Sequence, residues 1–468
     1  MATTKQLLLA GVFLVVLVTK HGLCGSAEEW KARSVYQVLT DRFGGPVTDS
    51  CNLNDYCGGT FSGLIDHLDY IEGMGFDAIW ISPVVTNTPG GYHGYWAKDF
   101  STINSHFGSA ADLKALVDAA HRRDMWVMLD IVLNHVGPVG SQFSAITPFS
   151  HPGDYHPQCS VSQYVCFTEE VLHCRLASLP DLNQQNATVA DELVAWVGRM
   201  ISEYQFDGIR ADTVMYINQD FWARVQAEAG VYIVGEVYSS VECNIAYQKH
   251  GVDATLSYPM FFTLRSVFQD GQSMNLIQSQ VDAYKGFPDA SILGTFIDNH
   301  DNPRFLYQNT NKIPQYLNAL TFVLFSQGVP IVYYGTEQYF AGGNDPANRE
   351  ILWPTKFQTS TPMYAFLAQL NSLRKNTTAW SFPQVQRYST DNFYAFSRGS
   401  TLVALTNSGA SFDISITYSP YTAGVKICNA LAVPADSDCL VTGASGAFTV
   451  SMGKGLPKIY VPAAAESA

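Results

Sequence analysis

FDGIRADTV, at residues 206–214, is the stretch of sequence that decides the fold. Small and apolar residues surround one charged pair, Arg210 and Asp212, and positions two apart on an extended chain point to the same side. The stretch predicts a buried parallel strand with both charges at its carboxyl end, where α/β folds place their active sites. Because a guanidinium lowers the pKa of a neighbouring carboxylate, Asp212 is expected to be an ionised nucleophile or metal ligand. The alternative is a structural ion pair.

Predicted strands and helices alternate along the chain on both sides of this stretch. Residues 109–123 have helical spacing, and Ser109 with Asp112 fits a capping box. About eight strands in this rhythm favour a closed (β/α)8 TIM barrel over an open doubly wound sheet. No glycine-rich phosphate loop follows the first strand, which counts against nucleotide binding. The expected strands are residues 35–39, 76–82, 126–134, 206–214, 231–236, 254–256, 292–297 and 330–334.

Two regions break this rhythm. Residues 136–187, rich in Pro, His, Ser and Cys, are too long for a plain loop and predict a small disulfide-stapled subdomain inserted after the third strand. From residue 381 onward, short β-type runs separated by Gly, Ser, Asn and Pro predict an antiparallel β-sandwich. The predicted organisation is a catalytic barrel at 28–380, interrupted by the insertion, and a sandwich domain at 381–468.

The beginning of the chain and its charge indicate where the protein works. Residues 1–27 are typical of a secretory signal, with Lys5, an apolar run at 7–18, and small residues Gly25 and Ala27. The run is too short to span a bilayer comfortably; a signal anchor is the alternative. The net charge of −14 argues against nucleic acid and anionic membranes as partners and suits a neutral substrate. We therefore expect a secreted protein without a membrane partner.

Nine cysteines fit an exported protein, and Cys24 is expected to leave with the signal. Sequence alone cannot assign the connectivity of the other eight. No CxxC pair supports a zinc site. Asn186 and Asn376 begin glycosylation sequons. Close spacing suggests the pairs Cys51 with Cys57, Cys159 with Cys174, and Cys428 with Cys439, and leaves Cys166 and Cys243.

Acidic residues stand at several of the predicted strand ends. Carboxylates that converge on one barrel mouth raise one another's pKa unless their surroundings divide them into roles. Glycoside hydrolysis uses such a division, because one ionised carboxylate attacks while one carboxylic acid protonates the leaving oxygen. A raised pKa is expected for Glu236, which follows a dry apolar run, and a lowered one for Asp212; the alternative for Glu236 is a strand-end salt bridge. The acidic residues are Asp130, Asp212, Glu236, Asp301 and, after the eighth strand, Asp345.

Four motifs occur in one order along the chain: DIVLNH at 130–135, GIRADTV at 208–214, GEV at 235–237 and FIDNHD at 296–301. With them the sequence resembles the α-amylase family of retaining glycoside hydrolases, and within it the secreted fungal-type α-amylases. Further stretches, including YHGYW at 92–96 and AGGNDPANRE at 341–350, extend the resemblance over nearly the whole chain after the signal.

The resemblance implies a role for each matching residue. Asp212 would be the nucleophile, Glu236 the general acid and then base, and Asp301 the third carboxylate, with Arg210 keeping Asp212 ionised. His135 and His300 would bond to the reacting glucose, and Tyr95 would stack on it. Both histidines could instead be structural, Trp96 could be core, and Asp345 with Arg349 could be an exposed i,i+4 ion pair. The other implied substrate contacts are His93, Trp96, Met215, Tyr216, Asp345 and Arg349.

Family members of this type hold a structural calcium ion between barrel and insertion. Calcium prefers hard oxygen ligands, several of which can be backbone carbonyls. The matching positions are the side chains of Asn134 and Asp181 and the backbone oxygens of Leu172 and Tyr216. Such an ion would shape the cleft without taking part in bond breaking.

The sequence departs from its fungal relatives at two places. Those proteins usually carry Lys-His where this chain has Met215 and Tyr216, so leaving-side sugars are expected to depend more on stacking. They also pair a cysteine matching Cys243 with one near position 287, where this chain has Phe287. Cys243 is therefore expected to be free or to pair with Cys166.

These observations lead to one expected function. The chain is expected to be a monomeric, calcium-dependent, endo-acting α-amylase whose substrates are starch, glycogen and malto-oligosaccharides. One alternative is a transglycosylase or short-oligosaccharide hydrolase of the same family. The other is a catalytically inactive relative that binds glucan or serves as a membrane-partner subunit.

Overall fold

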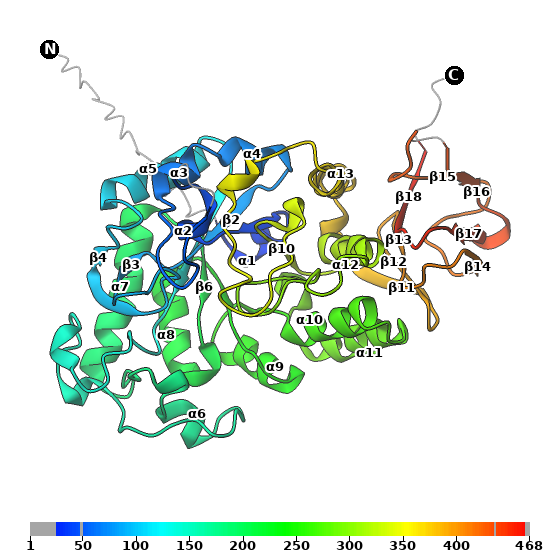
Figure 1. Cartoon of the computed structure of the whole chain (residues 1–468). Helices are drawn as coiled ribbons and strands as arrows, with labels where there is room; N and C mark the ends of the chain where they lie inside the picture. The colour runs from blue at the N-terminus through cyan, green and yellow to red at the C-terminus, as the bar shows by residue number, and fades with distance from the viewer. Residues whose placement is uncertain (1–24, 47–49, 435–436, 464–468) are drawn as a thin grey trace, which may run out of the picture.

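The computed structural model describes residues 25–46, 50–434 and 437–463. Its core is a sheet of eight parallel strands in the order β8-β7-β6-β5-β2-β1-β10-β9, and a parallel bridge between Leu256 and Gly294 joins the two edge strands. The predicted (β/α)8 barrel is thereby confirmed (Figure 1). The strands are β1 Val35–Gln37, β2 Ala78–Ile81, β5 Trp126–Ile131, β6 Gly208–Ala211, β7 Tyr232–Gly235, β8 Ala254–Thr255, β9 Gly294–Thr295 and β10 Val329–Tyr333.

Helices cover the barrel, so that its strands are buried on both faces. The predicted capping box is present, because the Ser109 side chain accepts from the Asp112 amide and the Asp112 carboxylate accepts from the Ser109 amide. The helices are α1 Ala27–Trp30, α2 Thr40–Phe43, α3 Phe61–Ile65, α4 Leu68–Gly73, α5 Ala110–His121, α7 Ala187–Tyr204, α8 Gln219–Ala229, α9 Val241–His250, α10 Tyr258–Leu264, α11 Asn275–Ala283, α12 Ile313–Phe325 and α13 Pro362–Thr377.

Two excursions leave the barrel near the candidate site. The first, which was not predicted, is a hairpin of β3 Val85–Asn87 and β4 Ala97–Ile103 after β2. The second is the predicted insertion after β5, which contains only short helical elements. An antiparallel bridge between His135 and Asp181 ties it to the end of β5. Its elements are η1 Phe143–Ala145, η2 Pro152–Asp154, α6 Glu169–His173 and η3 Leu176–Ser178.

Four disulfides cross-link the described part of the chain. The three predicted pairs, Cys51–Cys57, Cys159–Cys174 and Cys428–Cys439, are all formed. Cys243 on α9 is not free but pairs with Cys166 of the insertion, the second of the two expected possibilities.

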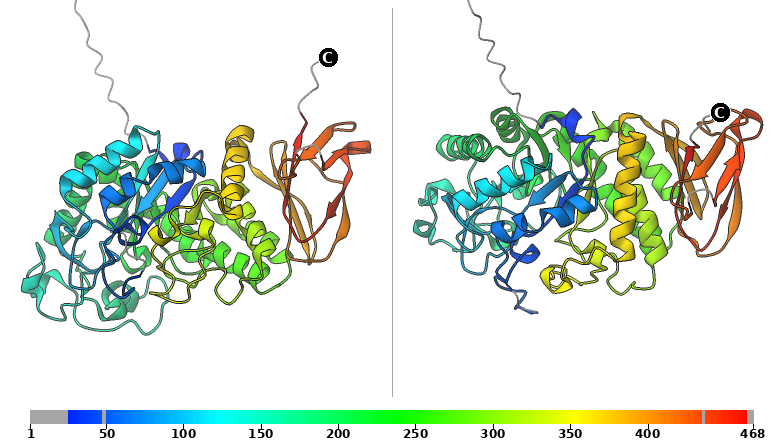
Figure 2. Two further views of the ribbon diagram at one scale, coloured as in Figure 1. Left: turned by 45° about the horizontal axis from the view of Figure 1, so that its top comes forward. Right: turned by 90° about the horizontal axis from the view of Figure 1, so that it is seen from above.

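The C-terminal strands form a separate lobe beside α12 and α13 (Figure 2). Six antiparallel strands and a two-stranded ribbon enclose a second apolar core, as a sandwich requires. The sequence did not predict β11, β14 and β16. The strands are β11 Gln384–Ser389, β12 Phe393–Arg398, β13 Thr401–Thr406, β18 Lys458–Pro462, β15 Lys426–Asn429 and β16 Cys439–Val441, with the ribbon of β14 Phe412–Ile416 and β17 Phe448–Met452.

Most of the predicted signal, residues 1–24 with Cys24, lies outside the described residues. Within the part of the chain that is described, no helix has both the length and the apolar character needed to cross a bilayer.

Candidate active site

Four charged side chains converge at the carboxyl ends of β5, β6 and β7. Asp130 on β5 pairs in register with Arg210 on β6, and Asp212 and Glu236 directly follow β6 and β7. Arg210 donates from Nη1 to Asp130 (3.0 Å) and Asp212 (2.8 Å). Its Nη2 donates to Glu236 (2.8 Å). One guanidinium therefore holds three carboxylates on the same side of the barrel mouth.

This cluster is nearly dry. The Arg210 side chain is 1% exposed, and those of Asp212 and Glu236 are 9% and 14% exposed. Arg210 also lies over the Trp80 ring, with Cζ 5.2 Å from the ring centroid. An unpaired charge at such a site costs several kcal/mol, so the arginine and the carboxylates depend on one another for their charged forms.

The two candidate catalytic carboxyl groups have different proton affinities. Burial raises the pKa of Glu236 to about 8; Arg210 opposes this shift, and Asp212 and Asp301 add to it. Burial also raises the pKa of Asp212 to about 6, against Arg210 and with Asp130 and Asp301. The predicted rise for Glu236 is confirmed, but the predicted lowering for Asp212 is wrong because desolvation outweighs the arginine. The predicted order holds: near neutral pH, Asp212 is mainly ionised and Glu236 mainly protonated.

Asp301, the third candidate carboxylate, lies in the loop after β9 and is 36% exposed. Its oxygens are 3.4 Å from Nε2 of His300 and 3.6 Å from Nη2 of Arg349. Burial favours the neutral form of Asp301, but His300, Arg349 and Arg210 together outweigh it and lower the pKa. Arg349 also pairs with Asp345 at 2.9 Å, as the i,i+4 spacing predicted; because Arg349 is only 6% exposed, this is more than a surface ion pair.

Two predicted histidines, His135 and His300, flank the carboxylates in neutral form. Burial lowers the pKa of His300 to about 3 and that of His135 to about 4. His300 Nδ1 lies 2.8 Å from the Gln37 amide nitrogen, and His135 Nε2 lies 3.2 Å from the Tyr95 carbonyl oxygen. The structure thus places both beside the candidate site and uncharged.

The loop of the unpredicted hairpin brings His93, Tyr95 and Trp96 to the same place. The Tyr95 hydroxyl donates to Asp130 (2.7 Å), and its ring stacks on His300 with centroids 5.2 Å apart. His93 accepts from the Tyr95 amide (3.0 Å) and meets Trp96 edge-on, with centroids 4.8 Å apart. Asp130 therefore holds the Tyr95 side chain in place, and Tyr95 in turn contacts His93 and His300.

Known proteins are similar to this chain over most of its length. A family model described as alpha amylase, catalytic domain, matches residues 37–381. The chain belongs to the alpha-amylase family of glycoside hydrolases. It is 42% identical over 374 residues to Alpha-amylase 1 of Lipomyces kononenkoae, covering 75% of this chain and 60% of that protein. It is 36% identical over 472 residues to Alpha-amylase 2 of Schwanniomyces occidentalis, covering 94% and 91%. The solved alpha-amylase from Malbranchea cinnamomea is similar, with a TM-score of 0.89 and 33% identity over 93% of this chain and 97% of that one.

In this alpha-amylase family member, Met215 and Tyr216, the two predicted leaving-side positions, line one cavity with Glu236. Met215 and Tyr216 are on η4 Val214–Tyr216, a short helix directly after the Asp212 strand. A cavity of about 350 Å³ opens there, and its walls are largely apolar and aromatic side chains. We call it the leaving-side cavity; it is lined by Tyr164, Leu176, Thr213, Met215, Tyr216, Glu236 and Tyr238.

The candidate site also includes residues that the sequence did not single out. The Tyr258 hydroxyl lies 3.4 Å from Glu236 Oε1 and accepts from the Asn299 amide (3.0 Å). Gln37 bonds to His300, and the Trp80 indole donates to Asp130 (3.0 Å). Gln37 and Trp80 lie within predicted strands, and Asn299 is inside the FIDNHD motif. A search for polar side chains inside the apolar strands, rather than acidic ones at their ends alone, would have found Gln37, the one polar residue of the predicted strand 35–39.

The four positions that resemble a calcium site offer only oxygen atoms. Asn134 Oδ1 is buried without a hydrogen-bond partner, as a group awaiting a ligand would be. Asp181 is buried and bonds to His156 through Oδ2 (2.6 Å). Helix α6, which carries Leu172, packs against η4, which ends at Tyr216. Across the described ranges, no cluster of three or more Asp, Glu, His or Cys side chains is suited to a metal. The donor set therefore fits a hard cation that uses amide and backbone oxygens.

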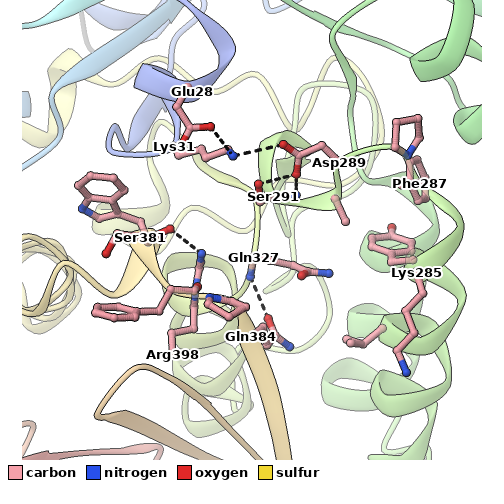
Figure 3. A pocket seen from close by; sticks show the side chains of 17 residues that line it. Glu28, Lys31, Lys285, Phe287, Asp289, Ser291, Gln327, Ser381, Gln384 and Arg398 are labelled. Carbon is pink, nitrogen blue, oxygen red and sulfur yellow. Dashed lines mark hydrogen bonds and ion pairs between the residues drawn. The ribbon is translucent and has the colours of Figure 1, made fainter.

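Another cavity, of about 450 Å³, lies at the opposite end of the barrel near the C-terminal lobe (Figure 3). Its walls include Lys31, Asp289 and Gln327, which precede β1, β9 and β10. Lys31 pairs with Glu28 (2.6 Å) and Asp289 (3.2 Å). Arg398 donates to three backbone carbonyls. Lys31 and Arg398 thus have partners within the fold, and the cavity lies away from the carboxylates, so it is not the candidate active site.

Proposed function

We propose that this protein is a secreted, monomeric, endo-acting α-amylase that hydrolyses internal α-1,4-glucosidic bonds of starch and glycogen with retention of configuration. The observation that carries the proposal is one arginine bonded to two carboxyl groups of unequal pKa, Asp212 at about 6 and Glu236 at about 8. Double displacement needs such a pair. The names of the curated relatives, which are alpha-amylases, support the substrate class.

Each carboxyl group has one task in each step. The Asp212 carboxylate attacks the anomeric carbon while the bond to the leaving sugar breaks, and Glu236 gives its proton to the leaving oxygen. In the second step Glu236 takes a proton from water, the water oxygen attacks the glucosyl ester, and Asp212 is released. Two inversions at the same carbon give net retention.

The surrounding residues bind and orient the reacting glucose. Asp301, held anionic, accepts bonds from sugar hydroxyls, and the neutral His135 and His300 bond to others. Such bonds accelerate the reaction when they strengthen as the ring approaches an oxocarbenium state. The Tyr95 ring offers a flat apolar surface for stacking. His93, Trp96, Asp345 and Arg349 surround the approach of the neighbouring sugar.

A bound calcium ion is part of this proposal. Asn134 and Asp181 would hold it through side-chain oxygens, and Leu172 and Tyr216 through backbone oxygens. When bound, the ion supplies charge that cross-links the insertion to the barrel, because its ligands come from both. Unfolding followed by circular dichroism, with and without a chelator, tests this: the melting temperature should fall on chelation and recover with added calcium. An unchanged melting temperature would remove the ion from the account.

The proposal of a secreted monomer has its own tests. Export is supported by the signal-like residues 1–27 and the four disulfides. The net charge of −14 argues against nucleic acid and anionic membranes as partners. Expression in a eukaryotic host should give a cleaved, extracellular protein that sediments as one chain of about 49 kDa, or more if glycosylated. Retention in the membrane fraction would favour the signal anchor.

Two substitutions test the catalytic assignment. Asp212→Asn and Glu236→Gln keep the shape of each side chain but remove the nucleophile and the acid. Starch hydrolysis should fall by at least a thousandfold in each. Asp282→Asn, at an exposed carboxylate on α11, is the matched control and should retain activity. Proton NMR of the first product should show the α-anomer; a β-anomer product, or active Asp212 and Glu236 variants, would contradict the proposal.

A second candidate function follows from the leaving-side cavity. Its apolar and aromatic walls at Met215, Tyr216 and Tyr238 suit a sugar acceptor that stacks, and a well-held acceptor competes with water for the glucosyl ester. A transglycosylase of the same family would therefore form products longer than maltotriose from maltotriose. An α-amylase would release glucose and maltose from it, or leave it intact, while cleaving starch.

A further inference from the structure

The leaving-side cavity is lined by segments far apart in the sequence: the insertion and the residues that follow β6 and β7. Met215 and Tyr216 come from η4, at the end of the strand that carries the nucleophile. Tyr164 and Leu176 come from the insertion and line the same cavity. The cavity's shape therefore depends on how the insertion is held against the barrel.

The part of the insertion that carries Tyr164 has little to hold it. Tyr164, Val165 and Phe167 are 59%, 54% and 45% exposed. Over residues 162–168, which the structure describes in full, no backbone hydrogen bond reaches the barrel. Apolar side chains this exposed bury too little surface to fix a segment by packing alone.

One helix, α9, supplies the missing attachment. Cys243 on α9 forms the disulfide with Cys166, two residues after Tyr164. Tyr247, one turn later on the same helix, stacks on Phe167 with ring centroids 5.3 Å apart. The covalent bond and the stacked pair both join α9 to the otherwise loosely held segment.

The same helix also holds the wall that η4 contributes. The hydroxyl of Tyr247 shares its one proton between the backbone carbonyls of Met215 (3.1 Å) and Ile217 (2.9 Å). Tyr247 is fully buried, so these bonds are protected from water. Neighbouring turns of α9 thus contact both walls of the cavity, the insertion through Cys243 and Tyr247 and η4 through Tyr247.

We propose that the Cys166–Cys243 disulfide and Tyr247 form a positioning clamp that sets the spacing of the two walls and thereby the binding of the leaving-side sugar. The proposal rests on the glycosidase function proposed above, and deepens it by assigning leaving-side specificity to α9. The clamp touches neither the reacting carbon nor the carboxylates. Loss of the clamp should lower kcat/KM only for substrates whose leaving group fills the cavity.

The test compares two substrates that differ on the leaving side. Maltoheptaose places glucose units in the cavity, whereas maltotriosyl fluoride has a leaving group too small to occupy it. The perturbation is the double variant Cys166→Ser/Cys243→Ser, which leaves no unpaired thiol. The matched control is Cys428→Ser/Cys439→Ser, which removes the disulfide of the C-terminal lobe.

The expected result is a change in the ratio of two kcat/KM values. In the Cys166→Ser/Cys243→Ser variant, kcat/KM on maltoheptaose should fall about three- to tenfold, the worth of one lost aromatic stacking contact. kcat/KM on maltotriosyl fluoride should stay within twofold of the wild-type value. The control variant should keep the wild-type ratio.

A double-mutant cycle separates positioning from general damage. In the wild-type background, Tyr164→Ala should lower the ratio of kcat/KM on maltoheptaose to kcat/KM on maltotriosyl fluoride. In the double cysteine variant the same substitution should lower that ratio little further. Tyr164→Phe in the wild-type background, which keeps the ring, should retain most of the ratio that Tyr164→Ala loses. Full additivity would overturn the clamp, as would an unchanged ratio in the double cysteine variant. An equal fall on both substrates would also overturn it, because the disulfide would then support the whole site. A wild-type protein inactive on maltoheptaose and starch would instead overturn the proposed function itself.

Discussion

The unequal pKa values of the two central carboxyl groups predict how activity depends on pH, and Asp130 offers a way to perturb one of them alone. With Asp212 at about 6 and Glu236 at about 8, roughly nine-tenths of each is in its active form at pH 7. At pH 5 only about a tenth of Asp212 is ionised, and at pH 9 only about a tenth of Glu236 is protonated. We therefore expect a bell-shaped kcat/KM profile with a roughly tenfold fall at both pH 5 and pH 9.

The substitution Asp130→Asn should move only the acid limb of that profile. The negative charge of Asp130 raises the pKa of Asp212, whereas the charges that act most on Glu236 are Arg210, Asp212 and Asp301. Burial raises the pKa of Asp130 itself to about 6, so Asp130 carries its charge over only the upper part of the acid limb. Removing that charge lowers the pKa of Asp212 modestly, so that Asp212 stays ionised to somewhat lower pH. Activity at pH 5, relative to pH 7, should rise, and the alkaline limb should stay in place.

The assay is kcat/KM on maltoheptaose from pH 4 to pH 10 at constant ionic strength, with Asp282→Asn as the control for a distant carboxylate. The limbs report the coupled cluster rather than single residues, so the comparison is between variant and wild type. An acid limb that stays in place or moves to higher pH would refute the reasoning. So would an alkaline limb that moves as far as the acid limb, because the division of roles would then not follow the local charges.

Three further substitutions test how the structure holds its parts. Arg265 donates to Ile297, Asp298 and Pro303, at both ends of the loop that carries Asp301. Because lysine cannot make all three bonds, Arg265→Lys should misplace this loop and lower kcat on starch about ten- to a hundredfold, with a smaller change in KM. Tyr95→Phe removes the hydroxyl bond to Asp130 and keeps the stacked ring. It should lower the free energy of unfolding by about 1.5–3 kcal/mol, measured by denaturant unfolding. A change near zero would show that water replaces the bond. Asn318→Ala removes two buried bonds from α12 to the C-terminal lobe and should lower the free energy of unfolding by about 2–4 kcal/mol, whereas an unchanged melting temperature would mean that the lobe is held by packing alone.

The barrel was predictable because its strands follow local rules. Residues 126–134 form an apolar run that ends on polar residues, and this pattern does not depend on what packs against it. The carboxyl ends of parallel strands meet at one edge, so Asp130, Asp212 and Glu236 could be placed together before any contact was known. The order of the carboxyl pKa values followed from the same placement.

The features that sequence missed depend on distant parts of the chain. The β3–β4 hairpin has irregular register, β3 has only three residues, and the exposed residues of β4 do not alternate, so the hairpin lacks the pattern that marks a sheet with one buried face. The direction of the Asp212 shift depends on how much water the folded cluster excludes, which only tertiary structure determines. Cys166 and Cys243 are 77 residues apart, so spacing gives no reason to join them, and their pairing was only one of two expected possibilities.

The barrel strands supply the groups for the chemistry, whereas the insertion and α9 supply much of the specificity. The carboxylates sit on or next to barrel strands, and the register between Asp130 and Arg210 fixes their mutual geometry whatever the insertion does. The leaving-side wall is different, because Tyr164 reaches the site from a segment that a disulfide and one stacked ring attach to α9. A substitution in residues 162–168 can therefore change which sugar is held beside Glu236 without moving Asp212 or Arg210. Changes in product pattern should accordingly come more readily from the insertion and α9 than from the barrel strands, where the same change would remove activity altogether.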